Sequence, residues 1–411
     1  MTEQQNTPEL RFPGFERKWE ILKLNEVLEN KTNGIKRGPF GGALKKEIFI
    51  NDGYAVYEQK NAIYDNQYFR YYIDKDKYEE MKLFAVKPED IIMSCSGTIG
   101  KLSKIPKNYK KGIINQALIR FRTNSHVISQ FFLIYMRSNI MQRKILEANP
   151  GSAIRNLIPV KELKNLRFPL PTLEEQQKIG DFFSKLDRQI ELEEEKLELL
   201  EQQKRGYIQK FFSQELRFKD ANGNSYPDWS IKKIEDISKV NKGFTPNTKN
   251  DEYWDELNEN WLSIAGMTQK YLYKGNKGIT KKGASKHAKV DKDTLIMSFK
   301  LTLGKLAIVK EPIYTNEAIC HFVWKESNIN TEYMYYYLNS INISTFGAQA
   351  VKGVTLNNDS INSIIVKLPV IQEQNKIAYF FNKLDKLIEK QSSKVELLKQ
   401  RKQGLLQKMF V

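Results

Sequence analysis

The feature that most constrains this chain is a segment of about 43 residues that occurs twice without a gap. The first copy runs from Leu170 to Phe212 (LPTLEEQQKIGDFFSKLDRQIELEEEKLELLEQQKRGYIQKFF), and the second runs from Leu368 to Phe410 (LPVIQEQNKIAYFFNKLDKLIEKQSSKVELLKQRKQGLLQKMF). Roughly half of the paired positions are identical, which is far above chance and indicates an internal duplication.

Each copy has the pattern of one long helix. Its apolar residues recur at alternating steps of four and three, which is typical of a coiled coil, and the Leu-Pro at its start ends any helix arriving from before it. The predicted coiled-coil seam consists of Ile179, Phe183, Leu186, Ile190, Leu197 and Leu200 in the first copy, and of Ile377, Phe381, Leu384, Ile388, Val395 and Leu398 in the second.

Both copies carry polar residues at the same two seam positions. Glu193 corresponds to Gln391, and Lys204 corresponds to Lys402. Because polar seam residues lower stability and fix the register, the match predicts that the two helices pack on each other in one alignment. The alternative is that each helix packs only on the domain next to it.

The duplication is circular. Glu9-Leu10-Arg11-Phe12 recurs as Glu215-Leu216-Arg217-Phe218 directly after the first long helix, and the second helix is followed only by Val411. The continuation that the second helix lacks is therefore found at the start of the chain. We expect the two termini to lie near each other.

Two variable segments, 20–168 and 226–366, alternate with the repeats, and each has the length of a normal domain. Each mixes strand and helix patterns: we predict strands at 54–57, 90–94, 261–264 and 294–298, and helices at 128–146 and 331–339. The two segments also share a pattern, since 92–102 aligns with 296–306 and 115–119 aligns with 316–320.

The chain has a formal net charge of +17 and a pI near 9.4, and most of the excess lies outside the two repeats. A basic surface favours a polyanionic partner. Nucleic acid comes before membrane, because no basic amphipathic anchor or lipidation motif is present. A basic protein that is merely soluble remains the alternative on charge alone.

Polar loops that contain glycine and follow predicted strands are the candidate binding sites, because they present donors and backbone amides from a fixed base. Ordinary strand turns would have the same composition. The candidate DNA contacts are Lys36, Arg37, Ser96, Thr98, Lys101, Asn115, Gln116 and Arg155 in the first half, and Lys242, Thr245, Asn247, Lys249, Lys300, Thr302, Lys305 and Lys352 in the second.

The sequence contains no recognisable catalytic motif. It has no phosphate-binding GxxxxGK[ST] loop, no dinucleotide fingerprint and no Asn/Asp-Pro-Pro-Tyr/Phe tetrapeptide of amino-methyltransferases. Its three histidines and two cysteines make no metal set, and His321 beside Cys320 is predicted to be a core residue. We therefore predict no catalytic residue and no metal ligand. The absence of a long apolar run and of a signal-peptide core predicts a cytoplasmic protein.

Taken together, the repeats and the variable halves resemble the specificity subunit of type I restriction–modification systems. The resemblance covers essentially the whole chain. It depends on these residues: Leu170-Pro171, Glu175-Gln176, Ile179, Phe182-Phe183 and Leu186-Asp187, with their partners Leu368-Pro369, Glu373-Gln374, Ile377, Phe380-Phe381 and Leu384-Asp385.

This resemblance implies an α+β chain with two α/β target-recognition domains, 1–168 and 216–366, related by pseudo-two-fold symmetry. The long helices, 169–215 and 367–411, would form an antiparallel coiled coil that separates them. Each domain would recognise one part of a bipartite, asymmetric site in double-stranded DNA, while the helices would set the spacer and dock two methylation subunits.

The same resemblance implies that this chain is not itself an enzyme. It would be part of a DNA adenine methyltransferase, or of an ATP-dependent restriction endonuclease when restriction subunits join. S-adenosylmethionine, ATP and magnesium would belong to those partner subunits. The alternative is a coiled-coil scaffold protein that binds DNA without sequence specificity.

Overall fold

The computed structural model describes residues 7–30, 33–147, 159–255, 257–300, 302–350 and 353–410. It divides into two compact units, one made of Met1–Glu194 with Ser393–Val411 and the other of Glu195–Ser392. In the described ranges, no helix is long and apolar enough to cross a membrane.

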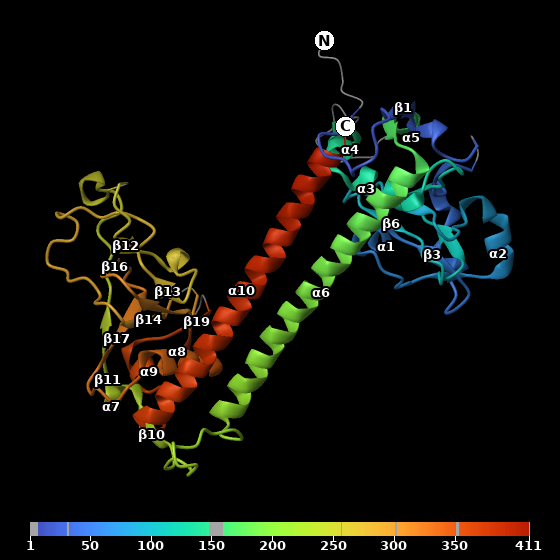
Figure 1. The fold of residues 1–411 in the computed structure, drawn as a ribbon. Helices are drawn as coiled ribbons and strands as arrows, with labels where there is room; N and C mark the ends of the chain where they lie inside the picture. The colour runs from blue at the N-terminus through green and yellow to red at the C-terminus, as the bar shows by residue number, and fades with distance from the viewer. Residues whose placement is uncertain are drawn as a thin grey trace. The chain divides into compact units, whose positions relative to one another are not determined.

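The two repeats form the long helices α6 (Leu173–Phe212, 40 residues) and α10 (Ile371–Met409, 39 residues), as predicted (Figure 1). Each begins two residues after the proline of its Leu-Pro pair. The boundary between the compact units cuts both helices near their midpoints, so each unit holds half of α6 and half of α10. The predicted domain boundaries, which assign each helix as a whole, stay a prediction.

In the first unit a four-stranded sheet has the order β2-β8-β5-β6, a three-stranded sheet has the order β4-β3-β7, and β1 pairs with β9. The strands are β1 (Glu20–Lys23), β2 (Ile35–Arg37), β3 (Tyr54–Tyr57), β4 (Tyr72–Ile73), β5 (Ile91–Ser94), β6 (Leu102–Lys104), β7 (Gly112–Ile114), β8 (Leu118–Phe121) and β9 (Arg167–Leu170). The helices are α1 (Gln59–Tyr64), α2 (Lys75–Glu80), α3 (Ser129–Arg137), α4 (Asn139–Glu147) and α5 (Val160–Asn165).

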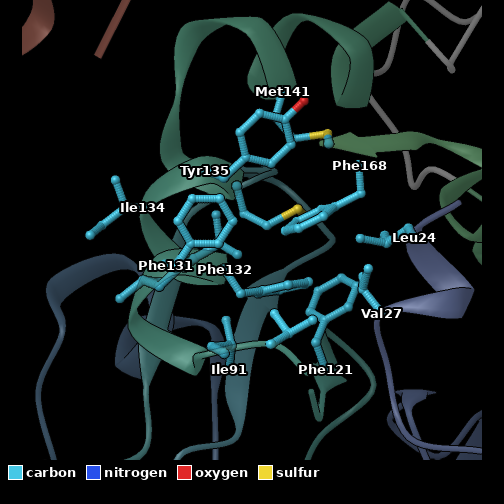
Figure 2. Close-up of a cluster of buried hydrophobic side chains, with 14 of the residues drawn as sticks. Leu24, Val27, Ile91, Phe121, Phe131, Phe132, Ile134, Tyr135, Met141 and Phe168 are labelled. Atoms are coloured by element: carbon cyan, nitrogen blue, oxygen red, sulfur yellow. The ribbon is translucent and has the colours of Figure 1, made fainter. Parts of the chain in front are cut away.

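The core of this unit forms where α3 covers the four-stranded sheet. Figure 2 shows Phe131 and Phe132 of α3 between the strand residues Ile91 and Phe121 and the α4 residue Met141. The seam residues of α6 from Ile179 to Ile190 belong to the same buried cluster. The first variable segment and the long helix therefore share one core.

In the second unit a five-stranded sheet has the order β11-β17-β14-β15-β13, and the pairs β10-β20, β12-β16 and β18-β19 accompany it. The strands are β10 (Ser230–Lys233), β11 (Ser238–Lys242), β12 (Trp261–Leu262), β13 (Tyr271–Leu272), β14 (Leu295–Ser298), β15 (Leu306–Val309), β16 (Tyr314–Thr315), β17 (Ile319–Trp324), β18 (Ala348–Ala350), β19 (Gly353–Thr355) and β20 (Ile365–Leu368). The helices are α7 (Ile234–Ile237), α8 (Thr331–Ser340) and α9 (Asn358–Asn362).

The two units repeat one arrangement. The sheet order β2-β8-β5-β6 returns as β11-β17-β14-β15, and Ile91 faces Phe121 as Leu295 faces Phe322. The similarity of 92–102 to 296–306 therefore marks the same hairpin in both units.

Two predicted elements differ from the structure. The helix expected at 128–146 is broken into α3 and α4 at Ser138, which has an extended backbone and whose hydroxyl accepts a hydrogen bond from the Met141 amide at 3.3 Å. The strand expected at 261–264 ends after Leu262, because a short 3-10 turn begins at Ile264.

Within each unit the two long helices pack antiparallel. In the first unit Glu193 of α6 pairs with Lys394 of α10 at 2.5 Å, and Asp187 pairs with Lys402. An earlier residue of α6 is therefore paired with a later residue of α10, which means that the two helices run in opposite directions. In the second unit Lys204 pairs with Asp385 at 2.5 Å, and further along α6 the Tyr207 ring lies 5.1 Å from the ring of Phe380, which precedes Asp385 on α10.

The seam residues proposed from the heptad are all buried or half-buried. Phe183 and Phe381 are fully buried, and Phe182 and Phe380 are half-buried and pack against Phe12 and Phe218, with ring centroids 5.7 and 6.1 Å apart.

The Glu-Gln pair of each repeat joins its helix to its own half. The Glu175 carboxylate accepts two hydrogen bonds from Arg11, at 2.9 and 2.7 Å, and one from the Trp19 indole at 3.1 Å. In the second unit Glu373 accepts the corresponding bonds from Arg217 and Trp229. These two carboxylates are almost completely buried, so the Glu-Gln motif that occurs in both repeats acts as a structural anchor.

The circular arrangement is confirmed within the first unit. The Leu10 amide donates to the Lys408 carbonyl at 3.0 Å, and the Lys408 ammonium pairs with Glu9 at 2.7 Å. In the second unit, Leu216 donates to the Lys210 carbonyl at the same distance. The N-terminal segment thus continues α10 as the segment after Phe212 continues α6.

Candidate nucleic-acid interface

In the first unit, the candidate loops meet where β2 ends and β8 begins. The amide of Gly38 donates to the Leu118 carbonyl at 2.9 Å, and a Cβ atom on Gly38 would lie 1.9 Å from the Asn115 carbonyl oxygen. Only glycine allows this approach. It brings the loop that follows Arg37 directly against the loop that carries Gln116.

The hairpin between β5 and β6 completes this cluster. The Gly100 amide donates to the Ser94 carbonyl at 2.9 Å, with Gly100 at a φ of +82°, and the Lys101 amide donates to the Ser94 hydroxyl at 3.0 Å. The side chain of Gln59 donates to the carbonyls of Ser96 and Thr98 at 2.5 and 3.2 Å. The loop is thereby held, while the side chains of Ser96, Thr98 and Lys101 are exposed.

Arg37 is oriented by contacts on both sides. Its Nε lies 3.5 Å from the Gln116 carbonyl, which also accepts from the Cys95 thiol at 3.7 Å, and its guanidinium lies 4.3 Å from the ring centroid of Phe40. Phe40 is 68% exposed. A guanidinium stacked on an exposed ring is well placed to meet phosphates or base edges.

Not every candidate of the first half joins this cluster. The Asn115 side chain accepts from the Ala117 amide at 3.0 Å and shapes the turn. Lys36 alternates to the other face of β2, where its ammonium lies 5.5 Å from the centroid of Phe84. Arg155 lies outside the described residues.

The second unit builds the same scaffold with different side chains. The Gly243 amide donates to the Ile319 carbonyl, and a Cβ atom there would lie 2.1 Å from the Thr315 carbonyl. The Asn316 side chain accepts from the Ala318 amide at 2.8 Å, as Asn115 does from Ala117. The backbone supports are thus retained.

The candidate cations of the second unit surround Phe299. The ammonium groups of Lys242 and Lys300 lie 4.6 and 5.7 Å from its ring centroid, and both lysines are exposed. Thr302 is exposed and Lys305 is half-buried in the same hairpin, where the Lys305 amide donates to the Ser298 hydroxyl at 3.1 Å. Four of the predicted residues therefore lie on one hairpin and its neighbouring strand end.

The remaining candidates lie in the loop after β11. The Thr245 hydroxyl accepts from the Asn316 side chain at 2.8 Å, and the Asn247 side chain accepts from the Lys249 amide at 3.0 Å. Asn247 and Lys249 are exposed. Lys352 lies outside the described residues.

Sequence reasoning missed three contributors: Gln59, Phe40 and the stack of Phe244 on His287, whose rings lie 3.5 Å apart. Gln59 could not be found, because only the tertiary fold brings α1 to the hairpin. Phe40 had a signal, since an aromatic residue between Gly-Pro and Gly-Gly in a basic loop has no strand or helix to pack into.

The buried thiols and the buried imidazole near these clusters are uncharged at neutral pH. Burial raises the pKa of the Cys95 thiol to about 11 and that of Cys320 to about 12. Burial lowers the pKa of His321 to about 4, and its ring contacts the Thr315 hydroxyl at 2.5 Å. These groups are neutral at pH 7, which agrees with a core role for His321.

Comparison with known proteins identifies the class. The model of the type I restriction modification DNA specificity domain matches residues 16–202 and 226–398. The chain therefore belongs to this family of DNA specificity proteins.

Individual relatives support this family assignment. The MjaVIII specificity subunit of a type I restriction enzyme from Methanocaldococcus jannaschii is 23% identical over 72% of this chain and 74% of its own length. The MjaIX specificity subunit of the same organism is 29% identical over 49% of this chain, which spans about half of that relative (48%). The S subunit of a type I system from M. genitalium shares the fold, with a TM-score of 0.58 at 16% identity over 98% of this chain and 99% of its own.

Proposed function

We propose that this chain is the DNA-recognition subunit of a type I restriction–modification complex, and that each half recognises one part of a bipartite site. The observation that carries the proposal is the duplicated scaffold that holds different side chains. Ser96 and Gln116 of the first cluster correspond to Lys300 and Glu317 of the second. Two rigid supports with unlike exposed groups suit two unlike half-sites.

Affinity should come largely from lysine and arginine contacts with phosphates, in line with the net charge of +17. Base contacts from the two hairpins would add the sequence preference. A scaffold without specificity would not need the same hairpin supports in both halves.

The helices α6 and α10 would set the distance between the half-sites. A helix of 40 residues is about 60 Å long at 1.5 Å per residue. DNA-binding proteins with two-fold symmetry bind half-sites whose separation is about one helical turn of DNA or a whole number of such turns. The spacer would therefore depend on helix length.

The same helices would dock two methylation subunits. Leu199 and Leu397 occupy matching positions of the repeat, lie outside the seam, and are 57% and 65% exposed. An apolar residue that stays exposed in both copies is what two copies of one partner would use. Those subunits would bind S-adenosylmethionine and methylate adenine, and restriction subunits would use ATP and magnesium.

The decisive experiment is to co-purify the chain with a methylation subunit of a type I system and to map methylated adenines by single-molecule sequencing. We expect one bipartite motif with a fixed spacer. A contiguous motif, or methylation without sequence preference, would contradict the proposal.

The docking part has its own test. Leu199→Glu combined with Leu397→Glu should abolish co-purification of the methylation subunit, whereas Leu83→Glu, at a leucine of the first unit that is 50% exposed, should not. Equal recovery of the partner by both variants would refute docking at these positions.

A further inference from the structure

A buried ammonium ion lies between the second recognition half and the long helices. The side chain of Lys270, just before β13, is only 12% exposed. Its Nζ contacts Glu332 at 2.5 Å and the Tyr336 hydroxyl at 2.7 Å, both on α8, and donates to the Asn382 side chain on α10. One lysine thus joins three elements of the second unit.

The surrounding groups complete a neutral network. The Tyr271 hydroxyl donates to Glu332 at 2.7 Å, and the Tyr336 hydroxyl donates its one proton to Asp385 and lies 2.8 Å from the Asn382 side-chain oxygen. Asp385 pairs with Lys204 of α6 and lies 3.8 Å from Lys270. Two cations therefore face two carboxylates, which is the arrangement that makes a buried charge tolerable.

The ammonium ion also lies over aromatic faces. Its distances to the ring centroids of Tyr336, Tyr271 and Tyr335 are 4.2, 4.9 and 5.0 Å. Burial lowers the pKa of Lys270 from its usual range, and the neighbouring Glu332 opposes that shift. Ion pairs, hydrogen bonds and ring contacts all fix the ammonium at one place.

The first unit has other residues at the matching positions. Glu332, Tyr336 and Asn382 correspond to Gln130, Ile134 and Ser184, and the Ser184 hydroxyl donates to the Gly180 carbonyl of its own helix at 2.7 Å. Only the pair Asp187–Lys402, which matches Asp385–Lys204, is kept. The network is thus a feature of the second half.

We propose that Lys270 is a positioning residue that fixes the second recognition half against the helices α6 and α10, and so sets the geometry with which that half meets its half-site. This rests on the proposed function. The network is carried by α8 and β13. Loss of the ammonium group would therefore allow the sheet of this half to change its orientation relative to α10. The first half would be unaffected.

The test uses the complex with the methylation subunit and DNA duplexes whose spacer is native, one base pair shorter or one base pair longer. Lys270→Met should lower affinity for the native spacer at least tenfold and reduce the preference for it over the altered spacers to less than threefold. Tyr271→Phe, which removes only one hydroxyl, should shift both quantities in the same direction by less. Lys274→Met is the control, because Lys274 is 70% exposed and pairs with Glu259 at the surface.

The outcomes separate the possible roles. Unchanged affinity, or an equal loss of affinity for all three spacers in both variants, would overturn the proposal, because a residue that only stabilises the fold leaves the spacer preference intact. If the wild-type complex itself showed no bipartite site, the proposed function would fail instead.

Discussion

Lys402 of α10 forms an ion pair with Asp187 of α6, and the repeat places Lys204 and Asp385 in the same relationship in the second unit, at 2.5 Å. These lysines are the polar seam residues that occur in both copies of the repeat. Each of these two lysines has an acidic partner on the opposing helix, at a place that antiparallel packing alone supplies.

The first prediction concerns this pair. Asp187 and Lys402 are 35% and 21% exposed, so solvent screens them in part, and a double-mutant cycle with alanine should give a coupling of about 0.5–1 kcal/mol. Urea unfolding is the suitable measurement, because guanidinium chloride would screen the charges. The swap Asp187→Lys with Lys402→Asp should recover most of the loss. A coupling near zero would contradict a register function for the pair.

The second prediction concerns the anchors at the start of each long helix. Glu175→Ala or Glu373→Ala removes a carboxylate that is 2% or 0% exposed and leaves an arginine and an indole without their acceptor. The free energy of unfolding should fall by about 3–5 kcal/mol in either case. Glu191→Ala is the matched control, since its pair with Arg188 is exposed on α6 and should change stability by less than about 1 kcal/mol. Equal effects of all three substitutions would refute the anchor.

Much of the architecture was predictable, because the information lies within short stretches or in the repeat. The heptad determined α6 and α10, and the recurrence of Glu9–Phe12 predicted the contact of Leu10 with Lys408. The match of 92–102 with 296–306 located the same hairpin in both halves, and with it the clusters that hold Arg37 and Lys300.

Other features depend on which distant segments meet, and no local pattern contains that information. The sequence around Gly38 is that of an ordinary turn, and only the tertiary structure shows that the Asn115 carbonyl lies too close to Gly38 for any side chain. In the sequence Lys270 is one basic residue among many, because its partners Glu332 and Asn382 lie more than 60 residues away along the chain. Asn115 is predicted to contact DNA, and its side-chain oxygen also accepts a hydrogen bond from the Ala117 amide. Whether the exposed candidates bind DNA stays a prediction.

A third prediction follows from His321. Its pKa is about 4 in the folded protein and about 6.5 when unfolded, so the unfolded state binds the proton first as the pH falls. Stability contributed by this residue is therefore lost below pH 6.5 and continues to fall until about pH 4. Between pH 7 and pH 5 the loss should be about 2 kcal/mol. His321→Gln should remove this part of the pH dependence of thermal unfolding, whereas the same change at the exposed His287 should leave it. An unaltered pH profile in His321→Gln would contradict the assignment.

A fourth prediction separates phosphate contacts from base contacts in the first cluster. Lys101→Ala should weaken binding to all DNA sequences and reduce the slope of log K against log salt by about 0.9. Gln116→Ala should instead cost about 1–3 kcal/mol for the cognate first half-site and leave non-specific binding unchanged. Fluorescence anisotropy of the complex over a salt series gives both quantities. A change of preference at the second half-site would show that the assignment of the halves is wrong.

The fifth prediction tests whether helix length sets the spacer. Four residues inserted after Glu194 and again after Ser392 fall at the boundary between the compact units, so the pairs Glu193–Lys394 and Lys204–Asp385 remain within their units. The insertion adds about 6 Å to each helix at 1.5 Å per residue. At about 3.4 Å per base pair, the spacer of the methylated motif should grow by one or two base pairs. A seven-residue insertion, which keeps the heptad phase, should give about three. Methylation mapping measures the spacer directly, and an unchanged spacer in both variants would mean that something other than helix length sets it.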